Sequence, residues 1–469
     1  MVMLQQTRTD DVSVSEEGTK RVVLMVTTLV AFLSPFGLSS VNIALPSIGK
    51  AFRMDAILLS WVTTAYLLAS ATFLVPFGKV ADLYGRKRIF TYGILIFTVA
   101  SLGCSVSQSA FMLVCFRIVQ GIGAAAMYCI GAAILTSVFP PRELGRVLGI
   151  NVAAVYLGLS AGPFGGGWLT QHLGWRSIFL VNVVLGSVLL LAIALKLKRE
   201  WLEAKGERFD LAGSVIYSAT LLLFMVGFSH LSARWGVGLV GLGGLGILAF
   251  IKWETKAEDP VLDIDLFRNN RVFAYSNLAA LINYSATFAV TFLLSLYLQY
   301  ITGLTPGKAG LILVFQPLMQ ALFSPLSGKL SDKIEPRIVA STGMGLTAVG
   351  LFLFIFLDER TTLGFIVGTL MLLGFGFALF SSPNMNAVMG SVEKKSYGVA
   401  SGTLGTMRAV GQVLSMGTTI LIFSVMIGNV QITPDTYPLF LRSVRWAFVF
   451  FTAFCGGGIL VSLARGRIR

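Results

Sequence analysis

Charged side chains are scarce in this chain. Aspartate, glutamate, lysine and arginine make up 12% of the 469 residues, whereas soluble globular proteins contain about 25%. Apolar residues make up 55%. Apolar runs of about 20 residues, each long enough to cross ~30 Å of hydrocarbon as a helix, recur to the end of the chain. This composition excludes a soluble multidomain enzyme and predicts an all-α polytopic membrane protein.

Groups that carry out catalysis or ATP hydrolysis are also scarce. The chain has two histidines, His172 and His230, and neither is followed by a carboxylate or a second histidine at the spacing of metal ligands. The sequence contains no GxxxxGK[ST] loop, which argues against ATP-driven transport. The four cysteines lie in apolar segments without paired spacing, so we interpret them as packing residues. We expect no metal, no cofactor and no enzymatic activity, and keep a polytopic membrane enzyme as a distant alternative.

The apolar runs predict fourteen membrane-spanning helices. A polar segment over residues 1–20 precedes them, and we expect it to be a disordered cytoplasmic tail. Charged stretches at 196–210 and 252–271 are interpreted as linkers that bracket two of the spans. The expected spans lie near residues 22–44, 57–77, 89–105, 110–136, 146–170, 176–196, 211–230, 235–251, 272–300, 309–328, 338–357, 361–383, 400–428 and 440–463.

Basic residues are distributed unequally over the two sides of this topology. If both termini lie on one side, that side receives 26 of the 36 lysines and arginines, the opposite side eight and the spans two. Lysine and arginine concentrate in the cytoplasmic loops of membrane proteins, so we expect both termini in the cytoplasm. Topology thus explains the formal net charge of +14, and no nucleic-acid partner is expected.

A short repeat divides the chain into two halves. The sequence GKVAD (78–82) ends the second span, and GKLSD (328–332) ends the tenth span 250 residues later. Secondary transporters are commonly built from repeated halves, with the substrate site between them. We therefore expect three parts after the tail: an N-terminal six-helix bundle over 21–199, linkers with two additional helices over 200–271, and a C-terminal six-helix bundle over 272–469.

Six short motifs follow one another in the apolar segments. They are VNIALPSI (41–48), GKVADLYGRKR (78–88), RIVQGIGAA (117–125), GLSAGPFGGG (158–167), WRSIFLVNV (175–183) and YLQYITGLTPGKAG (297–310). In this order they resemble the motifs of the major facilitator superfamily, and specifically of its fourteen-helix drug:proton antiporter branch. The resemblance covers residues 22 to 464. It implies two six-helix bundles with two extra linker helices, placed in the cell membrane.

The resemblance also implies a function, which is secondary active export of small amphipathic or hydrophobic compounds by alternating access, coupled to protons. The expected partners are the small-molecule substrate, the lipid bilayer and protons, and we expect a monomer. The alternative is an exporter or flippase of an anionic, zwitterionic or lipid-like substrate that works without proton antiport.

Two of the motifs imply moving parts. In the loop between the second and third spans, Gly78 and Gly85 are expected to permit a tight turn, and Arg142 is a plausible partner for Asp82. The resemblance implies that this loop is a conformational switch between the two halves. The alternative is that its basic residues only anchor the topology. Its residues are Gly78, Asp82, Gly85, Arg86, Lys87 and Arg142, with Asp332 at the repeated position.

The fifth span carries a stripe of small residues. Gly158, Gly162 and Gly166 are four residues apart, so they share one helix face and let a neighbouring helix approach closely. Pro163 is expected to kink the helix. Packing alone explains the glycines, whereas the resemblance implies that the four residues form a hinge.

Two arginines fall inside spans, where a charge is costly and indicates a functional site. Arg117 lies in the fourth span, with Gly121 and Ala125 one and two turns further on, and Arg408 lies in the thirteenth. The alternative for each is an arginine satisfied by backbone carbonyls. Polar and aromatic residues at mid-depth are candidates for the substrate or coupling site, although helix packing explains any one of them. They are Ser39, Asn42, Thr63, Tyr66, Asn283, Tyr284, Tyr297, Gln316 and Gln320.

Acidic residues are missing from the spans. None of the 22 falls in the middle of one. The branch commonly carries an aspartate five residues before the asparagine that matches Asn42, and here that position is Gly37. Exchange of a cationic drug for a proton needs a membrane-embedded carboxylate. The absence therefore predicts a neutral, zwitterionic or anionic substrate, and it argues against the proton coupling that the resemblance implies.

Overall fold

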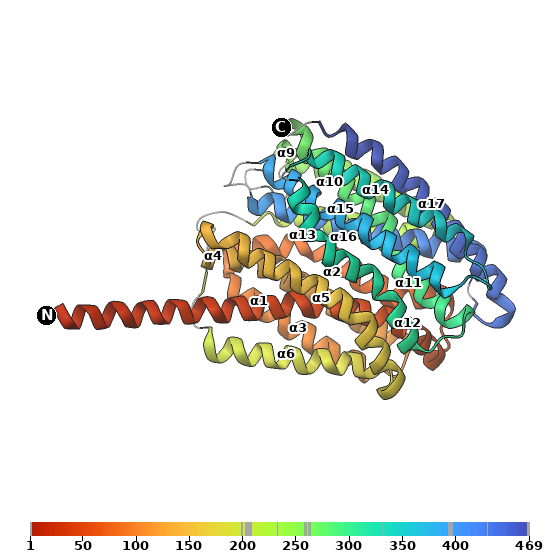
Figure 1. Ribbon diagram of the computed structural model, residues 1–469, viewed down its shortest axis with the longest axis horizontal. Coiled ribbons are helices and arrows are strands. Elements are labelled where there is room, and N and C mark those ends of the chain that lie inside the picture. Colours follow the sequence, from red (N-terminus) through yellow and green to blue (C-terminus); the bar gives the residue numbers. More distant parts are fainter. Residues whose placement is uncertain are drawn as a thin grey trace.

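The computed structural model describes residues 2–197, 200–201, 209–231, 233–257, 260, 264–331, 333–392, 397–428 and 430–466. The regular elements in this part of the chain are helices (Figure 1). In chain order they are α1 (Val2–Phe52), α2 (Ala56–Tyr84), α3 (Arg86–Ser105), α4 (Ala110–Val138), α5 (Pro141–Leu173), α6 (Arg176–Lys196), α7 (Leu211–Ser229), α8 (Arg234–Glu254), α9 (Ile264–Asn269), α10 (Arg271–Thr287), α11 (Ala289–Leu296), η1 (Tyr297–Ile301), α12 (Pro306–Leu313), α13 (Phe315–Ser331), α14 (Pro336–Leu353), η2 (Phe354–Phe356), α15 (Leu363–Gly390), α16 (Tyr397–Met426), η4 (Pro434–Thr436) and α17 (Tyr437–Ala464).

Fourteen helical segments of the described chain are long and apolar enough to cross a membrane, as expected. Polar side chains at their starts explain where several of them begin. Each of these side chains accepts a hydrogen bond from a backbone N–H group of the first turn, which has no partner within the helix. They include Asp55 before α2, Ser109 before α4, Asp210 before α7, Asn270 before α10, Thr305 before α12 and Thr362 before α15.

Two expectations about helix ends differ from the structure. Helix α1 begins at Val2 and projects beyond the bundle (Figure 1), whereas a disordered tail was expected over 1–20. Once a helix is nucleated, each added residue costs little, and no proline interrupts this segment.

Helix α2 continues through Gly78 to Tyr84, so the turn expected at Gly78 is wrong. The turn is made at Gly85, whose φ of 111° favours glycine.

The helices pack as two bundles and an added pair. Helices α1 to α6 contact one another, as do the helices from α10 to α17. Helix α7 pairs with α8 and also contacts α2 and α16, so it lies where the two bundles meet. Its Tyr217 and Ser218 hydroxyls donate to the carbonyls of Ala71 (3.0 Å) and Thr72 (3.2 Å) in α2. Pro76 in α2 has no N–H for the Thr72 carbonyl, so Ser218 supplies the missing donor.

The bundles are joined at the end opposite the termini. Pro46 leaves the carbonyl of Asn42 in α1 without its helical donor. The Ser295 hydroxyl of α11 donates to this carbonyl (2.7 Å), and the Gln299 amide donates to the carbonyl of Ile43 (2.9 Å). These hydrogen bonds connect the C-terminal part of α1 to the C-terminal bundle, so the bundles are held together and this end of the molecule is closed.

Three further bonds extend the closure to the loops at that end. The Ala56 N–H donates to the Val430 carbonyl (3.2 Å), and the Gln431 amide donates to the Arg53 carbonyl (2.8 Å). The Gly307 N–H at the start of α12 donates to the Gln171 side chain at the end of α5 (3.2 Å). Opening this end therefore requires that several cross-bundle hydrogen bonds break together.

Replacing both Ser295 and Gln299 by alanine should favour opening of the closed end. Each lost hydrogen bond is worth about 1 kcal/mol, so the equilibrium should shift by about 2 kcal/mol, or roughly thirtyfold. Spin labels on cysteines placed at Lys50 and Glu359, both exposed at this end, would report the change as longer distances. Ser285→Ala is the control, because that hydroxyl donates within its own helix. An unchanged distance distribution in the double variant would contradict the assignment.

Close packing of α4 on α2 depends on Gly121. A Cβ atom there would lie 2.3 Å from the Tyr66 carbonyl oxygen, so Gly121→Ala should push the helices apart at a cost of about 1–3 kcal/mol. We expect a lower melting temperature in detergent. The control is Gly368→Ala in α15, where nothing lies within 4 Å of the added atom and alanine should stabilise the helix by about 0.5–1 kcal/mol. Equal melting temperatures for the two variants would count against this packing.

Candidate functional site

Arg117 in α4 is almost completely buried within the N-terminal bundle. Its Nε donates to the Val62 carbonyl of α2 (2.9 Å), and one Nη donates to the Gln120 side chain. The guanidinium lies over the Tyr66 ring, 4.3 Å from its centre. The second Nη has no hydrogen-bond partner, and the described residues provide no carboxylate in ion-pair contact with this arginine. Arg117 is therefore a buried cation held by a carbonyl, an amide and an aromatic ring.

The expected polar residues of the N-terminal bundle are hydrogen-bonded within that bundle. Thr63 donates to the Asn42 side chain (2.8 Å), and the Tyr66 hydroxyl is 3.0 Å from that of Ser34. Ser39 is bonded within its own helix, to the Pro35 carbonyl. These side chains are therefore hydrogen-bonded inside one bundle, and among them Tyr66 also contacts Arg117.

Arg408 in α16 lies at a different kind of place, where the two bundles face each other. Its guanidinium is 5.6 Å from the ring centre of Tyr284 in α10. Two tyrosines of the other bundle, Tyr128 of α4 and Tyr156 of α5, are close enough to interact electrostatically with this cation. The Tyr156 hydroxyl is 3.5 Å from that of Ser381 in α15. One partly exposed cation of the C-terminal bundle thus lies near tyrosines from both bundles.

The other expected residues of the C-terminal bundle are less connected. Both polar side-chain atoms of Asn283 and the Oε1 of Gln316 are buried without a partner in the described chain, and Gln320 is buried as well. The Tyr297 hydroxyl instead donates to the Asp358 carbonyl (2.5 Å) in a loop at the closed end. There a hydrogen bond from the Thr361 hydroxyl lowers the pKa of the Asp358 carboxyl, and the Arg360 N–H adds to the effect. Tyr297 is therefore separated from the residues around Arg408.

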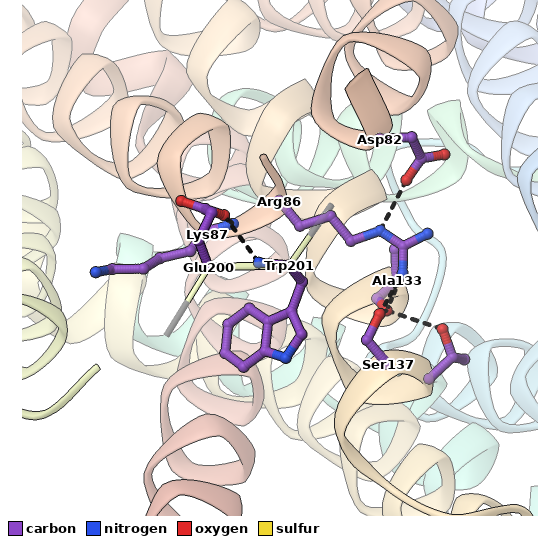
Figure 2. Close-up of polar contacts among 8 residues, drawn as sticks. Asp82, Arg86, Lys87, Ala133, Ser137, Glu200 and Trp201 are labelled. Carbon is purple, nitrogen blue, oxygen red and sulfur yellow. Dashed lines mark hydrogen bonds and ion pairs between the residues drawn. The ribbon is translucent and has the colours of Figure 1, made fainter. Parts of the chain in front are cut away.

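The loop expected to act as a switch is held by Arg86. Its Nε donates to the Asp82 carboxylate (2.7 Å), and one Nη donates to the Ala133 carbonyl (3.0 Å) and to the Ser137 hydroxyl (Figure 2). Asp82 therefore pairs with Arg86 of the same loop. The side chain of the expected partner, Arg142, and the whole of Asp332 lie outside the described part of the chain.

The segment after α6 is attached to the same loop. The Glu200 carboxylate accepts a hydrogen bond from the Lys87 N–H in the first turn of α3 (2.8 Å), and the Trp201 carbonyl accepts from the Arg86 N–H (3.0 Å). Figure 2 shows Glu200 and Trp201 beside the two basic residues. A Cβ atom on Gly85 would lie 2.7 Å from the Glu200 carboxyl carbon. Glycine is thus required here for its backbone angle and for the space it leaves.

The glycine stripe of α5 packs against α1. Cβ atoms added at Gly158, Gly162 and Gly166 would lie within 2.6 Å of atoms of Phe32, Ser39 and Ser40. The contact with the other bundle is made by the next residues, since a Cβ on Gly310 of α12 would lie 2.0 Å from the Pro163 carbonyl oxygen. The stripe therefore fixes α5 within its own bundle, and Pro163 lies on the boundary between the bundles.

Sequence reasoning missed three residues. Tyr128 and Tyr156 gave no signal, because tyrosines are common in membrane helices and only the fold brings them to Arg408. Arg465 follows the last apolar run and was assigned to the C-terminal tail. In the structure it is fully buried, and it donates to the Ser462 carbonyl (2.9 Å) and hydroxyl and to the Asn384 side chain (3.1 Å). Burial lowers the pKa of Arg465 to about 10.

Comparisons with known proteins agree with this architecture. The family model of the Major Facilitator Superfamily matches residues 27–253 and 277–467. The riboflavin transporter RibZ of Clostridioides difficile is 31% identical over 390 residues, which cover 83% of this chain and 85% of the relative. The multidrug transporter MdtP of Bacillus subtilis is 30% identical over 409 residues, covering 85% of this chain and 74% of the relative.

Solved structures share the fold at low sequence identity. A bacterial homologue of the human lysosomal transporter Spinster, in an inward-facing and unoccupied conformation, matches with a TM-score of 0.66 and 17% identity, covering 95% of this chain and 97% of the other. A POT family transporter bound to a thioalcohol-conjugated peptide matches with a TM-score of 0.69 and 15% identity, covering 94% of each chain. The expected family and the expectation of a transporter instead of an enzyme are confirmed. This chain, with fourteen candidate membrane spans in its described residues, is a multi-pass membrane transporter that belongs to the major facilitator superfamily, with relatives among multidrug transporters.

Proposed function

We propose that this protein exports small amphipathic or hydrophobic compounds by alternating access. The observation that carries the proposal is the closure of the end opposite the termini by hydrogen bonds between the bundles, such as that from Ser295 to the Asn42 carbonyl. A transporter that rocks two halves around a central site closes one end at a time. Relatives named for multidrug resistance and multidrug transport support export of this class of compound.

The proposal extends to orientation and to the moving parts. The excess of lysine and arginine on the side of the termini supports cytoplasmic termini in a bacterial inner membrane. With that orientation, the closed end faces outward. We assign the Asp82–Arg86 pair to a latch, since it ties the α2–α3 loop to α4. Pro163 is assigned to the hinge, because its carbonyl contacts the other bundle at Gly310.

Arg117 is proposed to couple substrate binding to movement. Breaking its contacts would leave a cation unpaired in a low-dielectric interior, so α2 and α4 are expected to move together around it. The contacts to Val62 and Tyr66 are the structural support for this coupling. A purely structural arginine that caps a carbonyl would show the same contacts, which makes transport the deciding measurement.

The substrate is proposed to be neutral, zwitterionic or anionic. At the position where the family commonly has an aspartate, Gly37 faces Asn182 of α6, and neither polar atom of the Asn182 side chain has a partner. No acidic side chain lies in the middle of a described span, so no described carboxylate is available to exchange a cationic drug for a proton. The relative named as a riboflavin transporter makes riboflavin, a neutral aromatic compound, a suitable first probe.

Arg117→Ala should abolish transport without preventing folding. We expect at least a tenfold loss of riboflavin flux in proteoliposomes, or of flux of another substrate identified by thermal-shift screening. The variant should keep a monodisperse elution profile. Arg176→Ala is a matched control, because Arg176 also lies over an aromatic ring, that of Trp175, and also donates to a carbonyl, but at a helix end. Near wild-type transport by Arg117→Ala would assign this arginine to packing.

The missing carboxylate predicts poor transport of dications. Proteoliposomes with an imposed pH gradient should move a dicationic dye such as propidium at rates close to those of protein-free liposomes. Gly37→Asp places a carboxylate beside the unpartnered Asn182 amide, where it can accept a hydrogen bond, and should increase dye efflux several-fold. Strong efflux of the dye by the wild-type protein, abolished by collapsing the pH gradient, would contradict the assignment of the substrate charge.

A further inference from the structure

Three arginines packed among the described helices have different surroundings. Arg465 donates to a carbonyl, a hydroxyl and an amide within the C-terminal bundle. Arg117 is enclosed by one bundle. Arg117 and Arg408 each have one buried nitrogen without a hydrogen-bond partner, but Arg408 differs because it lies between Tyr284 of its own bundle and a helix face that meets Tyr128 of the other bundle. A cation with an unused donor inside a membrane span is stabilised when an acceptor reaches it. Arg408 is partly exposed and can be reached by a ligand, whereas Arg117 is fully buried.

The rings near Arg408 leave room for a ligand. Tyr128 faces the other bundle, since a Cβ atom on Gly405, one turn before Arg408, would lie 3.9 Å from its ring. Even so, 44% of the Tyr128 surface is exposed. Tyr156, Tyr284 and Arg408 are each partly exposed as well. The space in front of these side chains is therefore not filled by protein.

The position along the helix suits a transported substrate. Arg408 is eleven residues after the start of α16, or about 16 Å along it at 1.5 Å per residue. This places the cluster inside the membrane-spanning segment, well away from the hydrogen-bonded closure at Ser295 and Gln299. A ligand could reach it only through the end that carries the termini or from between the bundles.

The chemistry of the cluster selects a class of ligand. A guanidinium has a planar fork of donors that matches a carboxylate or phosphate. Tyrosine rings offer flat faces to a second aromatic ring, and Tyr284 is itself packed edge-on against Phe377 at 5.3 Å. No acidic side chain lies mid-span in the described chain to compete for the cation. The combination favours a ligand that carries both an anionic group and an aromatic ring.

We propose that Arg408, Tyr128, Tyr156 and Tyr284 form the binding site for the anionic group of an aromatic substrate. This inference rests on the proposed transport function and names the substrate class. Binding there also couples to movement: Tyr128 and Tyr156 belong to the N-terminal bundle, and Arg408 and Tyr284 to the C-terminal bundle. An anion held between them draws the bundles together on the side of the termini, which the transport cycle requires.

Binding of two matched probes to the full-length protein in nanodiscs tests the site directly. The probes are 2-naphthoate and 2-naphthamide, which share the ring and differ in charge, and titration calorimetry is corrected with empty nanodiscs. The wild-type protein should bind naphthoate at least tenfold more tightly than naphthamide. Arg408→Gln should remove this preference, whereas Arg176→Gln, which changes an arginine at a helix end, should keep it.

Two further variants secure the test if Arg408→Gln does not fold. Arg408→Lys keeps the charge but loses the fork, so it should retain a reduced preference for naphthoate. Tyr128→Leu removes a partly exposed ring and should weaken naphthoate binding several-fold. The inference is overturned if naphthoate does not bind, if both probes bind equally to the wild type, or if the preference survives Arg408→Gln. Binding with the expected pattern but no flux of any compound in proteoliposomes would support the site and overturn the transport proposal instead.

Discussion

Hydrocarbon contains no water to satisfy polar groups, so every backbone carbonyl and every charge in a span needs a partner from the protein. Prolines inside the helices illustrate this requirement, because each one removes a backbone N–H donor. Pro46 and Pro76 each leave one helical carbonyl without its N–H donor, and a serine from another helix supplies the hydrogen bond in both cases. The first bond closes one end of the molecule, and the second attaches the added helix pair. The positions of two prolines thereby determine where separate parts of the fold are joined.

The same requirement separates the arginines by their surroundings. Arg86 and Arg465 lie near the end that carries the termini and are well supplied with acceptors. Arg117 is satisfied largely by a carbonyl and an aromatic ring. Arg408 has aromatic rings from both bundles but an unused donor. Arg86 and Arg465 thus bond to several acceptors, whereas Arg117 and Arg408 each keep one buried nitrogen without a partner. Of these last two, Arg408 lies where the bundles face each other.

Much of the fold could be predicted from the sequence, because span length, motif order and the distribution of basic residues depend on local composition. The fourteen spans and the family follow from these signals. The site was predicted less completely. Arg117 and Arg408 were identified because a charge within an apolar run is conspicuous. Tyr128 and Tyr156 were missed, since their role depends on which helices face each other, and Arg465 was missed because burial beyond the last apolar residue is a tertiary effect. The turn at Gly78 failed because two glycines suited the same turn, and only Gly85 adopts the required angle.

The attachment of the added helix pair has a mechanical consequence. Glu200 and Trp201 bind the linker to the α2–α3 loop, and Tyr217 and Ser218 bind α7 to α2. Toward the C-terminal bundle, Gly417 of α16 meets the apolar side chains of Met225 and Phe228. When the bundles rotate, we therefore expect α7 and α8 to move with the N-terminal bundle and to shift relative to α16 at Gly417. Rotation of the bundles would thus change the packing of α7 on α16 at Gly417 while the hydrogen bonds from α7 to α2 are kept.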